Sequence, residues 1–284
     1  MRDARPSTTA LRVAMRRAAH QLFDSPKVLD DPIAVPILGE KAQAQMRLEG
    51  RKIYARAARY VRAFMVVRSR FAEDELAAAI ARGASQFVIL GAGLDTFAYR
   101  NPYEEGRLRV FEVDHPATQK WKRERLAAGK IQIPASVTFA PVDFEKQALK
   151  DGLAAAGFEA QKITFFSWLG VTPYLTRAAM NSTLEFIAAM PVGSGVVFDY
   201  ALPRASLNWF GRLAFDAMAR RVAKAGEPFQ LFFEPAELTN ELRRLGFNKI
   251  EDWGKEQLNE RYFKDRADKL RVGGRLGRLM SASI

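Results

Sequence analysis

Cysteine is absent from the 284 residues of the chain, and histidine occurs only as His20 and His115. The chain therefore has no disulfides and no thiolate ligands, and it has too few imidazoles for a typical multi-histidine metal site. No apolar run approaches the roughly 20 residues that a membrane-spanning helix needs, and no apolar signal-peptide core follows Met1. We expect no metal, no membrane span and, by default, a cytoplasmic protein.

Acidic residues are scarce at the two ends of the chain. The net charge is +12, with a basic excess of nine in residues 1–70 and of five in residues 261–284. Such ends attract nucleic acid or an anionic small molecule, but they also occur as ordinary solvated surface. The aromatic and glycine signatures of common RNA-binding modules are missing. We therefore do not expect a nucleic-acid partner.

The hydrophobic pattern changes near residue 83. The earlier part has helical spacing, which predicts a helix over 8–20, a helix start at Asp30-Asp31-Pro32 and a long helix over 43–82. Beyond it, short apolar runs alternate with helical stretches, which is typical of βαβ units and a parallel sheet covered on both faces. The strands are expected at 86–90, 108–113, 137–142, 162–168 and 195–200, and the helices at 116–128, 145–156 and 176–189.

An aromatic and basic helical insertion at 203–226 interrupts this alternation. The alternation resumes with a helix over 235–245, a strand over 247–252, a helix over 255–262 and a strand over 275–282. The pattern predicts an α/β fold with a Rossmann-like, doubly wound, mostly parallel sheet of seven strands. Residues 1–82 would form an N-terminal helical cap on a domain of residues 83–284, in one structural unit.

Gly91 and Gly93 directly follow the first expected strand. Glycines there allow a tight turn and close approach of the backbone to a ligand, and ligands of such sheets bind at the carboxyl ends of the strands. The dinucleotide fingerprint requires a third glycine, but Thr96 occupies that position. This departure disfavours a nicotinamide dinucleotide.

The next two strands also end in residues suited to a nucleoside. Asp114 lies 23 residues after Gly91, where an acidic side chain accepts hydrogen bonds from a ribose diol. Asp143 and Phe144 could hold an adenine, through its amino group and its ring. Each aspartate could instead cap the following helix. Three successive strand ends with such residues together indicate a nucleoside-containing cofactor.

The fourth strand runs into "SWLGVTPYLT", residues 167–176. Thr176 is suited to cap the next helix. Trp168 and Tyr174 could form the wall of a reaction pocket or belong to the core, and the local sequence leaves both possibilities open.

Several segments together resemble the bacterial branch of the leucine carboxyl methyltransferase family. They are "RAAHQLFDSPKVLDDPIA", "VILGAGLDTFAYR", "FEVDHP", "PVDF", "WLGVTPYLT", "FFEPAELTNELRRLGF" and "LNERYF", and they extend over nearly the whole chain. Members of this family are class I methyltransferases that use S-adenosyl-L-methionine. The resemblance therefore implies this cofactor.

The resemblance also implies roles for individual residues. Gly91, Ala92 and Gly93 would line the methionine part of the cofactor, Asp114 would bind the ribose, and Asp143 and Phe144 would hold the adenine. In "VVRSRFAED", Arg68 matches the arginine that binds the cofactor carboxylate, with Arg70 as second choice. Leu169 stands where carboxyl-methylating members often carry glutamate. The cofactor amino group would then be bound from elsewhere, by a backbone carbonyl of Ser167 or Trp168.

The leading hypothesis is direct in-line methyl transfer to an oxygen of a small acidic metabolite, a carboxylate or a phenol. A carboxylate is ionised at neutral pH and needs no general base. The N-terminal helices and the insertion would close over the site. The expected acceptor-binding residues are Tyr174, Arg100, Arg261 and Tyr262, with Tyr99, Asn208 and Trp209 as further parts of the pocket wall. An RNA-modifying methyltransferase and a non-catalytic cofactor-binding protein are the alternatives.

Overall fold

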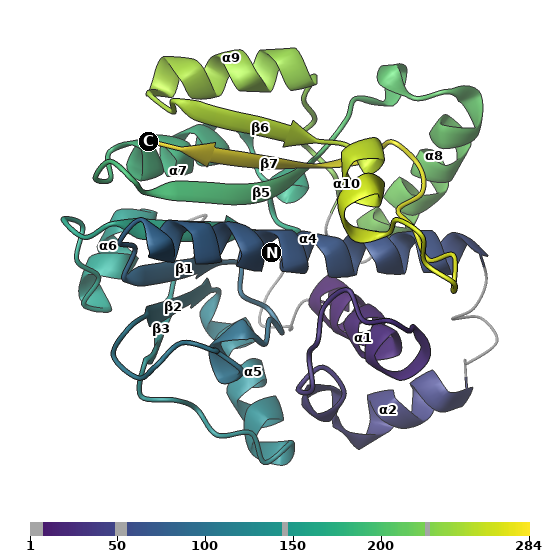
Figure 1. The fold of residues 1–284 in the computed structure, drawn as a ribbon, viewed down its shortest axis with the longest axis horizontal. Coiled ribbons are helices and arrows are strands. Elements are labelled where there is room, and N and C mark those ends of the chain that lie inside the picture. Colours follow the sequence, from purple (N-terminus) through teal and green to yellow (C-terminus); the bar gives the residue numbers. More distant parts are fainter. Residues whose placement is uncertain (1–7, 49–55, 144–146, 225–227) are drawn as a thin grey trace.

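Seven strands form one sheet in the order β3-β2-β1-β4-β5-β7-β6 (Figure 1). The computed structural model describes residues 8–48, 56–143, 147–224 and 228–284. Strands β1 to β5 run parallel, and β7 is antiparallel to both of its neighbours. The order reverses between β1 and β4, which is where ligands of doubly wound sheets bind. The strands are β1 (Gln86–Leu90), β2 (Arg109–Asp114), β3 (Val137–Pro141), β4 (Thr164–Trp168), β5 (Gly195–Ala201), β6 (Lys249–Trp253) and β7 (Gly277–Ser283).

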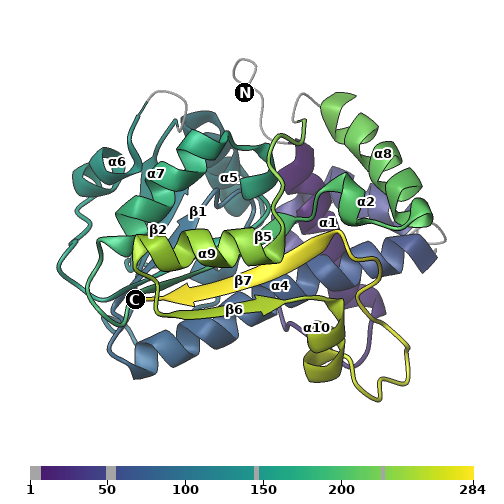
Figure 2. The same cartoon turned by 90° about the horizontal axis from the view of Figure 1, so that it is seen from above.

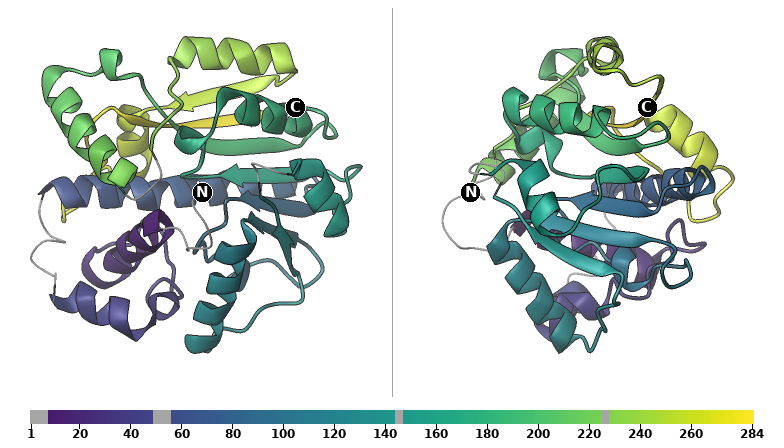
Figure 3. Two further views of the ribbon diagram at one scale, coloured as in Figure 1. Left: turned by 180° about the vertical axis from the view of Figure 1, so that it is seen from behind. Right: turned by 90° about the vertical axis from the view of Figure 1, so that its left-hand side faces the viewer.

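Helices cover both faces of this sheet, as the alternating pattern predicts (Figures 1 and 3). In β1, Phe87 and Ile89 pack into the core on one face, and Val88 and Leu90 pack into the core on the other. Because successive side chains of a strand point to opposite faces, the central strands must be apolar throughout. One face carries α4 (Arg56–Ala81), α5 (Pro116–Ala128) and α10 (Lys255–Tyr262), and the other carries α6 (Leu149–Ala155), α7 (Arg177–Ala188) and α9 (Pro235–Leu245).

The N-terminal helices form a third, smaller core outside the α4 face. Buried residues of α1 (Thr8–Phe23), η1 (Pro36–Leu38) and α2 (Gly39–Leu48) pack there against Leu126 of α5. In this way α1 and α2 are attached to the domain through α4 and α5. The N-terminal helices α1 and α2 therefore pack directly against the sheet domain.

Two of the expected helices have different bounds. Residues 32–35 form turns, the short 3-10 helix η1 follows, and an α-helix begins only at Gly39. Asp31 does not cap a helix because its buried carboxylate accepts a hydrogen bond from Thr96 Oγ1 at 2.7 Å. The described part of the range 43–82 belongs to two helices, α2 and α4, with different directions (Figure 1), and residues 49–55 between them lie outside the described residues.

The predicted insertion after the fifth strand is helical. It contains η4 (Arg204–Ser206) and α8 (Trp209–Lys224). Helices α8 and α1 lie at the same end of the molecule, opposite α6 (Figures 1 and 2). Among the described helices, none combines the length and the apolar character that crossing a membrane requires.

Candidate active site

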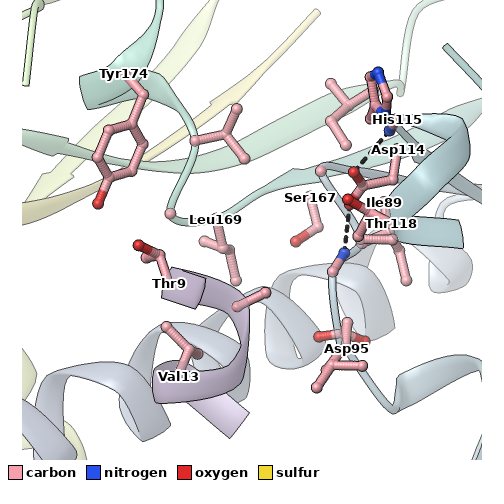
Figure 4. A pocket seen from close by; sticks show the side chains of 18 of the residues that line it. Thr9, Val13, Ile89, Asp95, Asp114, His115, Thr118, Ser167, Leu169 and Tyr174 are labelled. Carbon is pink, nitrogen blue, oxygen red and sulfur yellow. Dashed lines mark hydrogen bonds between the residues drawn. The ribbon is translucent and has the colours of Figure 1, made fainter. Parts of the chain in front are cut away.

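A cavity of about 300 Å³ lies at the carboxyl ends of β1 to β4. Its wall is formed by the loops after these strands, by the first turns of α1, and by residues that follow α8. Its place at the switch point of the sheet is that expected for a ligand site of this fold. Figure 4 shows that the charged side chains of Asp95 and Asp114 lie at one side, and Tyr174, Thr9 and Val13 at the other.

The glycine turn after β1 forms the floor of the cavity. Gly91 and Gly93 have φ angles of +67° and +45°, which glycine adopts readily and side-chain-bearing residues rarely do. A Cβ atom on Gly91 would lie 2.3 Å from Cγ2 of Val171, so the turn has no room for a side chain. The backbone N–H of Gly93 donates to Oδ2 of Asp114 at 2.6 Å. The turn is therefore a tight cradle that is tied to the end of β2.

Asp114 places its carboxylate in the cavity wall. Burial raises its pKa, although the backbone N–H groups of Gly93 and His115 oppose this by donating to the carboxylate. Asp114 does not cap α5, because the cap is Nδ1 of His115, which accepts the N–H of Ala117 at 3.2 Å. Each carboxylate oxygen has more than one acceptor position. The side chain can thus still accept hydrogen bonds from a diol in the cavity.

The end of β3 brings Asp143 to the same side of the cavity. Its Oδ2 lies 3.8 Å from Nε2 of His115, which also lines the cavity. Phe144 lies outside the described residues. The sequence analysis did not select His115 for the site, although it is the neighbour of Asp114 in the chain.

The geometry separates Arg68 from Arg70. Arg68 lines the cavity and forms an ion pair with Asp199 of β5, with 2.7 Å between Nη1 and Oδ2. The other oxygen of Asp199 accepts the N–H of Gly170 at 2.5 Å, so this carboxylate holds Arg68 beside the loop after β4. Arg70 is half exposed and pairs with Asp74, away from the cavity wall.

A second guanidinium, which the sequence analysis missed, comes from α1. Arg17 lines the cavity, donates to the carbonyl of Leu94 and lies 3.3 Å from Oδ2 of Asp95. Burial works to raise the pKa of Asp95, but Arg17 and Lys122 outweigh it and hold that pKa below its usual range. In the sequence, Arg17 is one of several arginines on a basic helix. Only the packing of α1 over the glycine turn shows that its side chain lines the cavity.

The loop after β4 supplies the opposite wall. Ser167, Leu169 and Tyr174 line the cavity, and Thr176 caps α7 as predicted. The ring of Trp168 does not form part of the wall: it is fully buried and packs on Phe198 in the core. The reason is the strand alternation, which turns Ser167 and Trp168 to different sides. A contact of the Trp168 carbonyl with the cofactor stays a prediction.

The structure does not bring the other expected acceptor residues to the cavity. Arg100 forms ion pairs with Glu73 and Asp31 on the α4 side. Arg261 and Tyr262, at the end of α10, both contact Asp74. None of these three side chains lines the cavity, and Glu73 or Asp74 of α4 engages each of them.

The remaining expected wall residues also lie elsewhere. The hydroxyl of Tyr99 donates to Glu112 inside the α4 face, at 2.9 Å. Asn208 accepts the N–H of Gly211 at the start of α8, and Trp209 is 66% exposed. Of the expected acceptor residues, Tyr174 is the one that lines the cavity in the described part of the chain.

We call one side of the cavity the apolar end, because the residues there have no charged side chain. It is defined by Thr9, Val13, Leu169, Tyr174, Leu175, Pro228 and Gln230. Pro228 and Gln230, at this end, are exposed to solvent. The opposite side, the polar end, contains Arg17, Asp95, Asp114, His115 and Asp143, and Arg68 lines the cavity beside Gly170 of the loop after β4.

Known proteins resemble this chain in sequence and fold. A family model described as leucine carboxyl methyltransferase matches residues 10–188. YktD of Bacillus subtilis strain 168, provisionally named an S-adenosyl-L-methionine-dependent methyltransferase, is 34% identical over 291 residues, which cover 95% of each chain. A Mycobacterium bovis protein with the same provisional name is 32% identical over 64% of this chain and 54% of its own. The fold is similar to that of a DUF574 family protein from Streptomyces avermitilis, with a TM-score of 0.57, 14% identity, and coverage of 99% and 98%.

Proposed function

Because the chain belongs to the leucine carboxyl methyltransferase family and is an S-adenosyl-L-methionine-dependent methyltransferase, we propose that it methylates an oxygen of a small acidic metabolite. The observation that carries this proposal is that one cavity has a polar end and an apolar end, the latter with the exposed residues Pro228 and Gln230. The polar end suits the cofactor, and the apolar end suits an acceptor that enters from outside.

The residues at the polar end fit S-adenosyl-L-methionine. Its ribose would bind Asp114, its adenine would lie beside Asp143, and its methionine part would lie on the turn of Gly91 to Gly93. The absence of space for a Cβ at Gly91 is what a backbone cradle for a ligand requires. The carboxylate of the cofactor would be bound by Arg68, and Arg17 also lines the cavity. Guanidinium groups suit this task because they donate two parallel hydrogen bonds to a carboxylate.

The chemistry of the apolar end favours a carboxylate acceptor over a phenol. When bound, the cofactor supplies a methyl group that its sulfonium already activates. The protein must then orient the acceptor oxygen and exclude water, and orientation can supply ~7–11 kcal/mol of such a barrier. Among the described residues of the apolar end there is no carboxylate, imidazole or amine to act as a base. A carboxylate needs none, since it is ionised at neutral pH and becomes an ester without losing a proton.

Calorimetry with S-adenosylhomocysteine tests the cofactor site. Asp114→Asn should weaken binding at least tenfold, because the neutral amide is a poorer acceptor for a ribose diol and hydrogen bonds to a charged group contribute ~1.5–3 kcal/mol. Asp151→Asn on the exposed side of α6 is the matched control and should leave affinity unchanged. Equal affinities of the Asp114→Asn variant and the wild type would refute the ribose role.

Methyl transfer itself is tested with labelled S-adenosyl-L-methionine and a panel of small carboxylic acids and phenols. We expect base-labile methyl esters, and an Asp114→Asn variant should form them more slowly. Transfer to RNA alone, with a steep loss of RNA binding on adding salt, would instead favour an RNA-modifying enzyme. Cofactor binding without transfer to any acceptor would favour a non-catalytic protein.

A further inference from the structure

The wall of the apolar end is backed by a cluster of aromatic rings. The ring of Tyr174 stacks on Phe229, with 5.3 Å between centroids and 30° between planes. Phe229 stacks on Phe215 of α8 at 6.1 Å, and Phe232 packs edge-on against Phe215 at 5.6 Å. The four rings come from η3 (Thr172–Tyr174), α8 and the segment after α8. We call Tyr174, Phe215, Phe229 and Phe232 the aromatic cluster.

Hydrogen bonds hold the ring of Tyr174 in place. The backbone N–H groups of Gln230 and Leu231 donate to the carbonyl of Pro173, at 2.7 and 3.2 Å. The side-chain amide of Gln230 donates to the carbonyl of Tyr174 at 2.9 Å. The segment around Phe229 is therefore fixed against the turn that carries Tyr174. As a result, the ring of Tyr174 faces the cavity while Phe229 and these hydrogen bonds hold it from behind (Figure 4).

Two further features of the apolar end bear on what it binds. Val13, Leu169 and Leu175 make the rest of the wall apolar, so a charged or strongly polar body would be poorly solvated there. Oγ1 of Thr9 is buried, and within the described chain it has no hydrogen-bond partner. In Figure 4 this hydroxyl lies on the same side of the cavity as Tyr174. A hydroxyl in this position can donate to an oxygen of a bound acid.

We propose that the acceptor is an aromatic carboxylic acid whose ring packs on Tyr174 and whose carboxylate points past Thr9 toward the polar end. An aromatic ring suits the cavity-facing side of the Tyr174 ring because stacked ring pairs contribute stabilisation beyond their buried area. This proposal rests on the proposed methyl transfer to an acid and specifies the body of that acid. It makes Tyr174 the residue that selects the acceptor, with Phe229 as the positioning residue behind it.

The test compares 3-phenylpropanoate with 3-cyclohexylpropanoate, two acids that differ only in the aromaticity of the ring. Their dissociation constants are measured by calorimetry on the full chain, in the presence of saturating S-adenosylhomocysteine. We expect the phenyl acid to bind about three- to tenfold more tightly, because the saturated ring buries similar apolar area but does not stack. Equal binding of the two acids, tighter binding of the cyclohexyl acid, or no binding of either would overturn the proposal.

Three variants assign the preference to the ring of Tyr174. Tyr174→Leu should abolish the preference, and Tyr174→Phe should retain it. Phe210→Leu is the matched control, because Phe210 is 63% exposed on α8 and packs on Trp209, outside the aromatic cluster. A preference that persists in Tyr174→Leu would contradict the role of Tyr174. Affinity for S-adenosylhomocysteine reports on folding and should stay within about twofold in all three variants.

Turnover separates this inference from the proposed function. Ester formation from both acids at equal efficiency, with equal binding, would contradict the aromatic acceptor and leave the O-methylation proposal intact. Preferential binding of the phenyl acid without any methyl transfer to acids would contradict the O-methylation proposal and leave only an aromatic binding site at Tyr174.

Discussion

At the scale of single residues, Asp24, just after the end of α1, is held by hydrogen bonds from two elements. Its carboxylate lies 2.9 Å from Nδ1 of His20 and receives two hydrogen bonds from Arg62 of α4, each at 2.7 Å. Nε2 of His20 accepts the N–H of Val28 at 3.0 Å, so Nδ1 carries the proton and donates to Asp24. Burial works to raise the pKa of Asp24, but the hydrogen bonds from His20 and Arg62 outweigh it and lower the pKa to about 2. The cap is thus fastened to α4 by a buried ionic cluster.

This lowered pKa predicts a loss of stability in acid. The pKa of Asp24 is lower in the folded chain than its ordinary value of 3.8, so the stabilisation is present above pH 4 and is lost as the pH falls toward 2. The loss amounts to about 1–2 kcal/mol in the free energy of unfolding, which urea denaturation between pH 2 and pH 7 measures.

Asp24→Asn should also destabilise the fold at neutral pH, by more than the pH-dependent contribution alone. We expect a cost of ~3–5 kcal/mol there, since the neutral amide replaces a charge that accepts two hydrogen bonds from the buried guanidinium of Arg62. Its dependence on pH below 4 should also be shallower than that of the wild type. The control is Asp30→Asn, because Asp30 is exposed. Parallel pH curves for Asp24→Asn and the wild type would show that Asp24 makes no such contribution.

At the scale of elements, α1 is the part that completes the cavity. A Cβ on Gly93 would lie 3.2 Å from Cβ of Ala10, so the first turn of α1 packs directly over the glycine turn. Further along α1, Arg17 reaches the carbonyl of Leu94 and the carboxylate of Asp95, and its Nε lies 3.8 Å from Asp31. The same guanidinium that lines the cavity therefore fastens the helix to the loop after β1.

We expect Arg17→Lys to loosen α1 as well as to weaken cofactor binding. Lysine keeps the charge but cannot contact the carbonyl of Leu94 and the carboxylate of Asp95 with one planar fork. Loss of one hydrogen bond to a charged group, ~1.5–3 kcal/mol, should speed amide exchange in residues 8–23 roughly tenfold or more. Hydrogen exchange and calorimetry measure the two effects, with Arg12→Lys on the exposed side of α1 as control. Weaker binding with unchanged exchange would mean that Arg17 acts only through the ligand.

At the scale of the whole molecule, one cavity joins segments that are far apart in the chain. Its wall contains residues of α1 near one end of the chain, the loops after four strands, and Pro228 and Gln230 beyond α8. A ligand there would contact the cap, the sheet and the segment after α8 together. The molecule should consequently respond to its cofactor as a single unit.

Saturation with S-adenosylhomocysteine should therefore raise the melting temperature in one transition. At 100 times the dissociation constant the stabilisation is ~2.7 kcal/mol, which corresponds to roughly 5–10 °C for a domain of this size. Scanning calorimetry tests this, and Asp114→Asn should show a smaller rise at the same ligand concentration. A cap that melts separately, with no shift on adding ligand, would contradict the prediction.

The fold and the presence of the strand-end residues at the cavity could be predicted because they depend on local patterns. Strands that are buried on both faces must be apolar throughout, and the seven-stranded sheet follows from their alternation with helices. Gly91, Asp114 and Asp143 stand directly at strand ends, and parallel strands bring their carboxyl ends to one edge. The position of each in the chain is therefore enough to place it at the cavity.

The positions of the residues that were expected to bind the acceptor could not be predicted from such local patterns. Arg100 and Arg261 have the charge that an acidic acceptor needs, but Glu73 and Asp74 engage them on the outer side of α4.

The amino-acid sequence by itself determined the order of strands and helices, the glycine turn and the family to which the chain belongs. Only the tertiary structure decided which arginines face the cavity, that Arg17 of α1 is one of them, and that Tyr174 rests on an aromatic cluster. The physical reason is the separation along the chain of the residues that interact. A strand end or a turn is set by neighbouring residues, whereas the ion pair of Arg68 with Asp199 joins positions 131 residues apart. Contacts of that range depend on the packing of whole elements, which no local pattern contains.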